Sequence, residues 1–229
     1  MGKDNQPKHR QARQLQRKKA KRRSYERILI VSEGSKTEPQ YFKELRSEYR
    51  LSSANVLVIP SGLGTDPLSV VQSAREIFTK GDSHSGIEAR SFEMVYVLVD
   101  RDDHTTYHQA LDCAASLNRK LRNDLGQPIL FRVIASVPCF ELWLLLHFSN
   151  IDEQHPLSRQ EVYARLKEHL PGYEKGEKGH FDATKPRIDE AIARSQQLAN
   201  VKNEHDDQGP FCAVHELVQT LTNLGRSQE

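Results

Sequence analysis

Three aspartates follow directly on a short apolar segment near the middle of the chain. Residues 94–99 are all apolar, and Asp100, Asp102 and Asp103 occupy three of the next four positions. Carboxylates held this close together repel one another unless a positive charge lies among them. A hard divalent cation that prefers oxygen ligands, Mg²⁺ or Mn²⁺, is the natural candidate. The D-x-D pair of Asp100 and Asp102 therefore predicts a metal site.

A second acidic group follows an earlier apolar segment, residues 28–31. Glu33 comes two residues after this segment and Glu38 five residues later, so both are candidate metal ligands. Lys36 lies between them and is either a point charge that holds a substrate phosphate or a neutralising surface lysine. Glu141 stands inside a later apolar segment, where an unpaired charge is costly. We expect Glu141 either in the same site or in an ion pair inside the fold.

Predicted strands must position these acidic residues. Strands are expected at 28–32, 55–60, 94–99 and 129–136, and helices at 40–50, 68–79, 105–124 and 140–148. This alternation indicates an α/β fold with a parallel four-stranded sheet flanked by helices. Continuous apolar runs suit strands that are covered on both faces. Because ligands bind at the carboxyl ends of such strands, the acids after the first and third strands are expected to converge at one sheet edge.

The chain changes character after the fourth predicted strand and its helix. Amphipathic helices are expected at 161–170, 183–199 and 211–224, with a loop rich in Gly, Lys and Glu at 171–181. We therefore predict three parts: a basic flexible arm at 1–25, an α/β domain at 26–150, and a C-terminal helical extension, 151–229, packed on the core.

The first 25 residues are strongly basic. They contain ten Lys or Arg and one Asp, a net charge of about +9. The whole chain has a net charge of +2, so the remaining residues carry 2 − 9 = −7. With almost no large apolar residue, this arm is expected to be disordered. A basic arm on an acidic body is typical of nucleic-acid-binding proteins, and the candidate contacts are Lys18, Lys19, Lys21, Arg22 and Arg23. A solubilising tail, or a helix that docks on an acidic partner, is the alternative.

Composition argues against membrane and secreted classes. No apolar stretch approaches the roughly 18 residues that span a bilayer, and no apolar region follows the basic N-terminus as a secretory signal requires. The three cysteines are widely spaced and form no C-x-x-C pair. A reduced, cytoplasmic protein without membrane contact is therefore expected.

Motif spacing argues against several phosphate-handling classes. GSKT at 34–37 lacks the glycines that a P-loop would need at positions 30 and 35. Haloacid dehalogenase phosphatases and phosphate-receiver domains carry their key aspartate after the first strand. Here the D-x-D follows the third predicted strand instead.

Two motifs together resemble a known fold. VSEGSKTE at 31–38, followed by VLVDRDD at 97–103, resembles the Toprim fold of topoisomerases, primases and old-type nucleases. More closely, EGSKTEPQYF, VDRDD and SVPCFELWLLLHF, in this order, resemble the RloB-like family over roughly residues 27–225. The resemblance implies a Toprim-like fold and a metal-dependent nuclease centre for DNA or RNA, tRNA included. It also implies that the gene lies near bacterial restriction and phage-defence loci, and that an ATPase is the partner.

The resemblance also implies roles for single residues. Glu33 would act as general acid or base or as a metal ligand, and Asp100 with Asp102 would be the metal-binding D-x-D. Glu38 would match a second acid of the old-type nucleases, one residue farther along than in that family. Asp103 either joins these ligands or caps the following helix.

Two other hypotheses stay open. The chain could be a Toprim-fold effector or binding module that serves an ATPase without cutting. His104 and His108 are spaced i, i+4 on the predicted helix, a spacing that could bind zinc in a hydrolase. The oligomeric state is also open, a homodimer included.

Deleting residues 1–24 is expected to weaken nucleic-acid binding and to flatten its salt dependence. Each phosphate that a Lys or Arg neutralises steepens the slope of log K against log salt concentration by about 0.9 on duplex DNA. Fluorescence anisotropy of a labelled oligonucleotide over a range of salt concentrations measures this slope. An unchanged slope would count against a nucleic-acid role for the arm.

Overall fold

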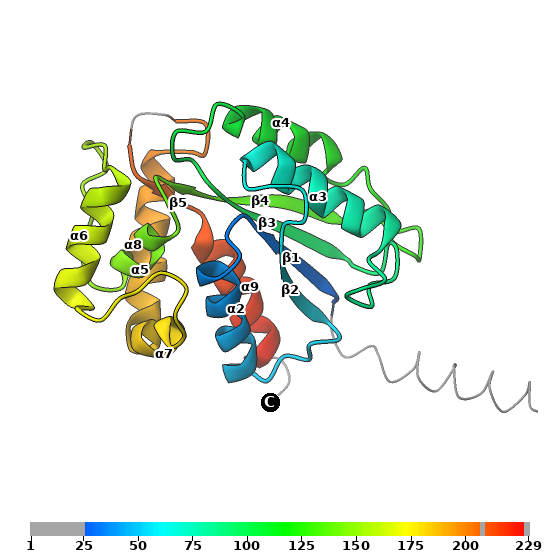
Figure 1. Cartoon of the computed structure of the whole chain (residues 1–229), viewed down its shortest axis with the longest axis horizontal. Coiled ribbons are helices and arrows are strands. Elements are labelled where there is room, and N and C mark those ends of the chain that lie inside the picture. The colour runs from blue at the N-terminus through cyan, green and yellow to red at the C-terminus, as the bar shows by residue number, and fades with distance from the viewer. Residues whose placement is uncertain (1–25, 207–208, 227–229) are drawn as a thin grey trace, which may run out of the picture.

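The computed structural model describes residues 26–206 and 209–226 as an α/β protein (Figure 1). The predicted arm, with Lys18, Lys19, Lys21, Arg22 and Arg23, lies outside the described residues. In chain order the elements are β1 Ile28–Ser32, α2 Thr37–Glu48, β2 Val56–Pro60, α3 Pro67–Lys80, β3 Met94–Asp100, α4 Tyr107–Leu117, β4 Leu130–Val137, α5 Glu141–Leu146, α6 Arg159–His169, α7 His180–Thr184, the 3₁₀ turn η1 Lys185–Arg187, α8 Ile188–Val201, β5 Phe211–Cys212 and α9 Val214–Arg226.

The strands form one sheet in the order β2-β1-β3-β4-β5. The first four are parallel, so their carboxyl ends share one edge of the sheet. β1 and β3 lie at the centre, and almost every side chain in them is buried. This agrees with their unbroken apolar sequences, because a strand covered on both faces has no polar side to present to water.

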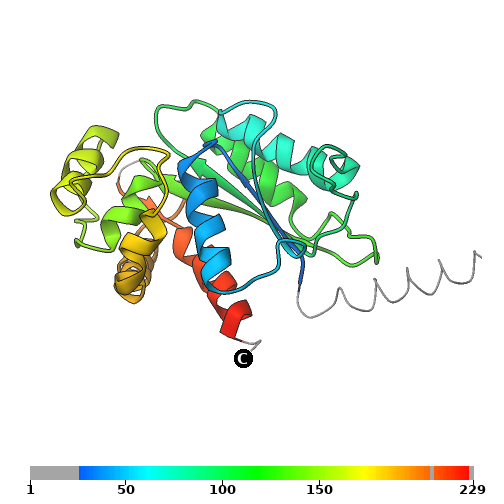
Figure 2. The same ribbon diagram turned by 60° about the horizontal axis from the view of Figure 1, so that its bottom comes forward.

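Helices cover both faces of the sheet (Figures 1 and 2). α3 and α4 pack together on one face, and α2 and α9 lie on the other. α3 begins as its sequence predicts, because the Asp66 side chain accepts a hydrogen bond from the Ser69 N–H and Pro67 takes the first helical position.

The sheet has five strands, so the expectation of four is wrong. Phe211–Cys212, predicted as the start of a helix, pairs antiparallel with the end of β4. A two-residue strand is too short to produce a periodic pattern, which is why its sequence merged with that of the helix. α9 then begins at Val214 and packs against β4.

The helix predicted at 105–124 is shorter at both ends. α4 runs from Tyr107 to Leu117, and its N-cap position is Thr106, so Asp103 does not cap it. The helix ends where the Asn118 side chain turns to accept a hydrogen bond from the Phe131 N–H of β4. This hydrogen bond to β4 marks the end of α4, although the apolar stripe that predicted the helix continues beyond Leu117.

The C-terminal residues return to the same core. α5 packs against α6 and α8. β5 joins the sheet beside β4, and α9 packs on the same face of the sheet as α2 (Figure 1). The helix predicted at 183–199 is divided into α7, η1 and α8, because Pro186 interrupts the hydrogen-bond ladder there. The division of the chain at residue 150 remains a prediction.

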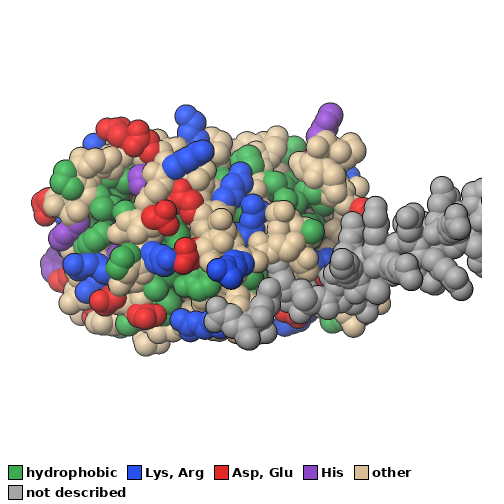
Figure 3. All heavy atoms as spheres, turned by 90° about the horizontal axis from the view of Figure 1, so that it is seen from below, with side chains coloured by type: hydrophobic (Ala, Val, Ile, Leu, Met, Phe, Trp, Pro, Cys, Tyr) green, Lys and Arg blue, Asp and Glu red, His purple; other side chains and the backbone are tan. Residues whose placement is uncertain are grey.

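Within the described ranges, no helix combines the length and apolar character that crossing a membrane requires. Figure 3 views the molecule from below Figure 1, and basic and acidic side chains are interspersed over the described part of that face. This face therefore has mixed charge rather than a uniformly basic surface.

His147 makes stability depend on pH. The side chain is fully buried at the end of α5, and its Nδ1 lies 2.9 Å from the Trp143 carbonyl oxygen, while Nε2 has no partner among the described residues. Burial lowers the pKa of His147 to about 4. In the unfolded chain the imidazole takes up a proton near pH 6.5, so stability is lost as the pH falls from about 6.5 to about 4.

We expect this loss to reach about 3 kcal/mol in the free energy of unfolding at pH 4. The measurement is urea unfolding of wild type and His147→Gln between pH 4 and pH 7. The packing cost of the substitution is the same at every pH, so the difference between the two proteins isolates the titration. If their pH profiles run parallel, His147 does not titrate in this way.

Candidate metal centre

Glu33 and Asp100 meet at the carboxyl edge of the sheet. β1 pairs with β3 so that Ser32 lies opposite Leu98, and the Glu33 N–H extends this ladder to the Leu98 carbonyl at 3.1 Å. The Glu33 side chain then accepts a hydrogen bond from the Asp100 N–H at 3.1 Å. The two predicted acidic clusters thus converge, as neighbouring parallel strands require.

Asp102 is held in a strained turn beside them. Its φ is +36°, in the left-handed region that side chains other than glycine rarely adopt. Its N–H donates to the Pro138 carbonyl at 3.0 Å, and the preceding N–H of Arg101 donates to Ser136 at 2.8 Å. Strain of this kind costs on the order of 1–3 kcal/mol and is typical of functional sites. Asp103, in contrast, is exposed at the rim.

His104 completes a compact group of potential ligand atoms. One such atom from each of Glu33, Asp102 and His104 lies within 4.8 Å of the other two. The His104 Nε2 is 3.5 Å from Glu33 Oε1. The zinc hypothesis assumed that His104 and His108 share a helix, but α4 begins only at Tyr107. His108 instead stacks on the His205 ring, with centroids 6.1 Å apart, so the predicted pair does not form.

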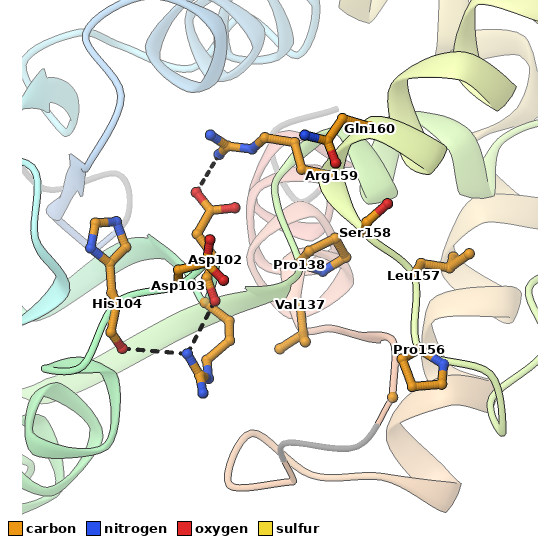
Figure 4. Close-up of a pocket in the computed structure, with 12 residues that line it drawn as sticks. Asp102, Asp103, His104, Val137, Pro138, Pro156, Leu157, Ser158, Arg159 and Gln160 are labelled. Atoms are coloured by element: carbon orange, nitrogen blue, oxygen red, sulfur yellow. Dashed lines mark hydrogen bonds and ion pairs between the residues drawn. The ribbon is translucent and has the colours of Figure 1, made fainter.

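Arg159 bridges the two aspartates. Its Nη2 lies 3.0 Å from Asp100 Oδ2. The same atom lies 2.6 Å from Asp102 Oδ2 (Figure 4). Burial alone would lower the pKa of Arg159, but the charges of Asp102 and Asp100 raise it well above its ordinary value. An arginine therefore supplies the positive charge that the carboxylates demand in this structure.

The position of Arg159 was not predicted. α6 begins after Ser158, whose side chain accepts from the Glu161 N–H in a reciprocal capping box. The S-R-Q-E pattern indicates a helix start, so it could have placed Arg159 in the first turn of α6. No local pattern could have revealed that this turn packs against the end of β3.

Glu38 lies in the first turn of α2 and is 5% exposed. Burial, together with the charges of Glu141 and Glu33, raises the pKa of Glu38 to about 7. Its Oε2 has no hydrogen-bond partner among the described residues. A Cβ at Gly34 would lie only 2.1 Å from this carboxylate, so the glycine is what lets Glu38 approach the Glu33 loop.

Glu141 is paired by phenols rather than by a cation. It is 1% exposed, and its Oε1 accepts hydrogen bonds from Tyr163 and Tyr173, each at 2.8 Å. Burial and the Glu141 charge raise the pKa of both tyrosines. Its Oε2 is buried without a partner in the part of the chain that the structure describes. Of the two alternatives for Glu141, the ion pair is replaced by two hydrogen bonds, and the Glu141 charge acts on Asp100.

Two lysines come from neighbouring segments near the acidic residues, the N-terminus of α2 and the loop that contains Gly176. Lys36 stands at the N-terminus of α2, where it is exposed and its side chain lies against Gly176. Lys175, in the loop that contains Gly176, lowers the pKa of Glu38 and Asp102 through its charge. Lys175 was missed because a loop rich in Gly, Lys and Glu looks like ordinary surface.

Electrostatics of the site favour an added cation. Burial raises the pKa of Asp100, Glu33 and Asp102, and the neighbouring carboxylates raise that of Asp100 further. The donor atoms are mainly hard carboxylate oxygens, which suit Mg²⁺ or Mn²⁺. The buried Oε2 of Glu38, which has no hydrogen-bond partner among the described residues, lies outside the group of Glu33, Asp102 and His104. The residues present therefore fit a divalent cation.

A cleft of about 810 Å³ opens beside Asp102 (Figure 4). One wall consists of residues 101–104 with Val137 and Pro138, and the other of residues 156–160 and Gly209. Its volume lies in the range of ligand-binding pockets, about 300–1,000 Å³. A substrate in this cleft would reach Asp102, His104 and Arg159.

Replacing Arg159 with Met should destabilise the protein by about 1–3 kcal/mol at neutral pH, because the aspartates lose their counter-charge. This is less than the ~3–5 kcal/mol of a fully buried pair, since the Arg159 side chain is 36% exposed. Added Mg²⁺ or Mn²⁺ should stabilise the variant more than wild type, because the cation replaces the missing charge. Urea unfolding with and without the cation measures both effects.

The matched control is Lys167→Met, which removes a positive charge from an exposed position of the same helix. We expect this control to change stability by less than about 0.5 kcal/mol. Equal losses in the two variants, or a variant that the cation does not rescue, would show that Arg159 does not neutralise the site.

Comparison with known proteins gives one match. The family model described as RloB-like protein matches residues 28–221, which is most of the chain. No match was found among curated proteins or among solved structures.

Proposed function

The chain belongs to the RloB-like family, and from the geometry of its acidic centre we propose that it is a metal-dependent nuclease. In this proposal Glu33, Asp100 and Asp102 hold Mg²⁺ or Mn²⁺, and the enzyme hydrolyses phosphodiester bonds of DNA or RNA, tRNA included. The observation that carries the proposal is the 3.1 Å hydrogen bond from the Asp100 N–H to the Glu33 carboxylate. This bond fixes the Glu33 carboxylate at the end of β3, where a ligand atom of Asp102 lies within 4.8 Å of it and a cleft opens.

The parallel strands support a Toprim-type architecture. In that interpretation β1 positions the glutamate and β3 positions the D-x-D, and the register between them places both at one sheet edge. β5 is an antiparallel addition at the far side of β4 and does not change this arrangement. The proposal therefore depends on β1 and β3 alone.

Each group in the centre has a role in this proposal. A bound cation would polarise the scissile phosphate and activate a water molecule. Glu33 holds the cation or transfers a proton, while Asp100 and Asp102 hold the cation. Arg159 orients the phosphate, because its planar guanidinium suits phosphate oxygens. Its contacts with Asp100 and Asp102 place the guanidinium at the centre. Lys36 is a second positive charge in the Glu33 loop.

The biological setting proposed is bacterial phage defence in the cytoplasm, near restriction loci, with an ATPase as partner. Nucleic acid would be drawn to the protein by the basic arm and cut in the cleft. The body of the chain carries net negative charge, so substrate attraction must come from the arm and from cations at the centre.

One observation favours a second candidate, a Toprim-fold module that binds a partner ATPase without cutting. Arg159 contacts both Asp100 and Asp102, so the two aspartates share one positive counter-charge without a metal ion. Co-purification with the ATPase, combined with a Mn²⁺ soak of crystals, separates the two functions. Density beside Asp100 supports the nuclease, and an empty acidic site with a stable complex supports the module.

The nuclease proposal is tested by cleavage of plasmid DNA and of tRNA with Mg²⁺ or Mn²⁺. Glu33→Ala and Asp100→Asn should each lower the cleavage rate at least about a hundredfold, because several kcal/mol of transition-state stabilisation depend on the bound cation. Asp112→Asn, at an exposed aspartate of α4, is the matched control and should cleave like wild type. Equal cleavage by all four proteins would remove the proposed chemistry.

A further inference from the structure

We propose that His104 is a nitrogen ligand of the centre, which makes it a mixed nitrogen and oxygen site that prefers a first-row transition cation such as Mn²⁺ over Mg²⁺. This inference rests on the proposed function, because it names the cation of the same centre. The observation behind it is the juxtaposition of His104 with Glu33 and Asp102, whose ligand atoms all lie within 4.8 Å of one another.

The backbone holds His104 at the centre. The residue lies in the turn between β3 and α4, where its N–H donates to the Arg101 carbonyl at 3.1 Å. The Arg101 side chain in turn donates to the carbonyls of Asp102 and His104, at 3.1 and 3.4 Å (Figure 4). The His104 side chain is 31% exposed, so a cation entering from the cleft can reach its ring.

A second observation points to a cation independently of this group. Glu38 is only 5% exposed, and its Oε2 has no hydrogen-bond partner among the described residues. Its carboxylate lies against Gly34, next to Glu33; the Glu33 charge acts on Glu38, and the Glu38 charge acts on Asp100. A buried acceptor without a donor costs about 1–3 kcal/mol or more. A cation at the Glu33 side of the centre would remove that cost.

The donor atoms determine which cation is favoured. Mg²⁺ takes oxygen ligands and retains several waters, whereas imidazole nitrogen suits transition metals. Glu33 and Asp102 supply oxygen, and His104 supplies nitrogen at 3.5 Å from Glu33 Oε1. Of the proposed ligands, Glu33, Asp100 and Asp102 supply only oxygen, so a preference for Mn²⁺ over Mg²⁺ rests on the His104 nitrogen.

The decisive measurement is pulsed electron paramagnetic resonance of Mn²⁺ bound to the full-length protein. An imidazole nitrogen bound to Mn²⁺ gives ¹⁴N modulation of the electron-spin echo, and ¹⁵N-histidine labelling assigns that modulation to histidine. We expect the modulation in wild type, its loss in His104→Gln, and its retention in His108→Gln. His108 is the matched control, because it is a nearby histidine that stacks on His205 away from the ligand group.

Calorimetric titration gives a second readout. His104→Gln should weaken Mn²⁺ binding by at least about 10- to 100-fold, because losing a residue that only supports a metal ligand already costs that much. Mg²⁺ binding should change by less than about threefold, because its ligands are oxygen atoms. The ratio of the two affinities in wild type and variant is therefore the test of selectivity.

The outcomes separate this inference from the proposed function. Bound Mn²⁺ without nitrogen modulation in wild type, or modulation that survives in His104→Gln, overturns the role of His104 and leaves the carboxylate centre intact. Absence of any Mn²⁺ or Mg²⁺ binding overturns both. Absence of nitrogen modulation in wild type overturns the role of His104 whether or not the variant folds, and thermal unfolding of His104→Gln shows whether a loss of modulation reflects the ligand or the fold.

Discussion

Mutual repulsion among buried carboxylates is the constraint on which the rest of this structure depends. Glu33, Glu38, Asp100 and Asp102 lie close enough for their charges to act on one another at the carboxyl edge of the sheet, and burial raises the pKa of each. Such an arrangement is stable only if other groups compensate the charge. The sheet supplies the rigid framework, because β1 and β3 are almost wholly buried and fix the distance between their ends.

The compensation comes largely from the C-terminal residues. Arg159 of α6 bridges two aspartates, while Tyr163 and Tyr173 hold Glu141, and Lys175 adds a positive charge from its loop. These contacts are part of the centre and not of a separate accessory layer. The strand acids and the helical extension therefore depend on each other, since removing the extension would leave the carboxylates unpaired.

This arrangement gives the aspartates a counter-charge in the absence of a metal ion, and it is compatible with the proposed metal site. Arg159 binds the aspartates through a single Nη2 atom, so a cation can take over the carboxylates while the guanidinium turns to another anion in the cleft. Membership of the RloB-like family fits this account, and the proposed activity rests on the geometry of the centre.

Sequence patterns were sufficient for the main features of the fold. Unbroken apolar runs predicted β1 and β3, and the alternation of elements predicted a parallel sheet with Glu33 and Asp100 at one edge. These features follow from local periodicity and from one topological rule, so neighbouring residues contain the information. The family motifs, which are equally local, identified the RloB-like family that the comparison confirmed.

Only the tertiary structure decided the chemistry around those acids. Arg159 reaches Asp100 across 59 positions of sequence, and Glu141 meets Tyr173 across 32. β5 is too short to have a period, and α4 starts late enough to remove His104 from the helix and place it beside Glu33. Each outcome depends on side chains that are distant in sequence and close in space. Packing and charge pairing depend on the separation of atoms in the folded molecule, which local sequence patterns do not contain.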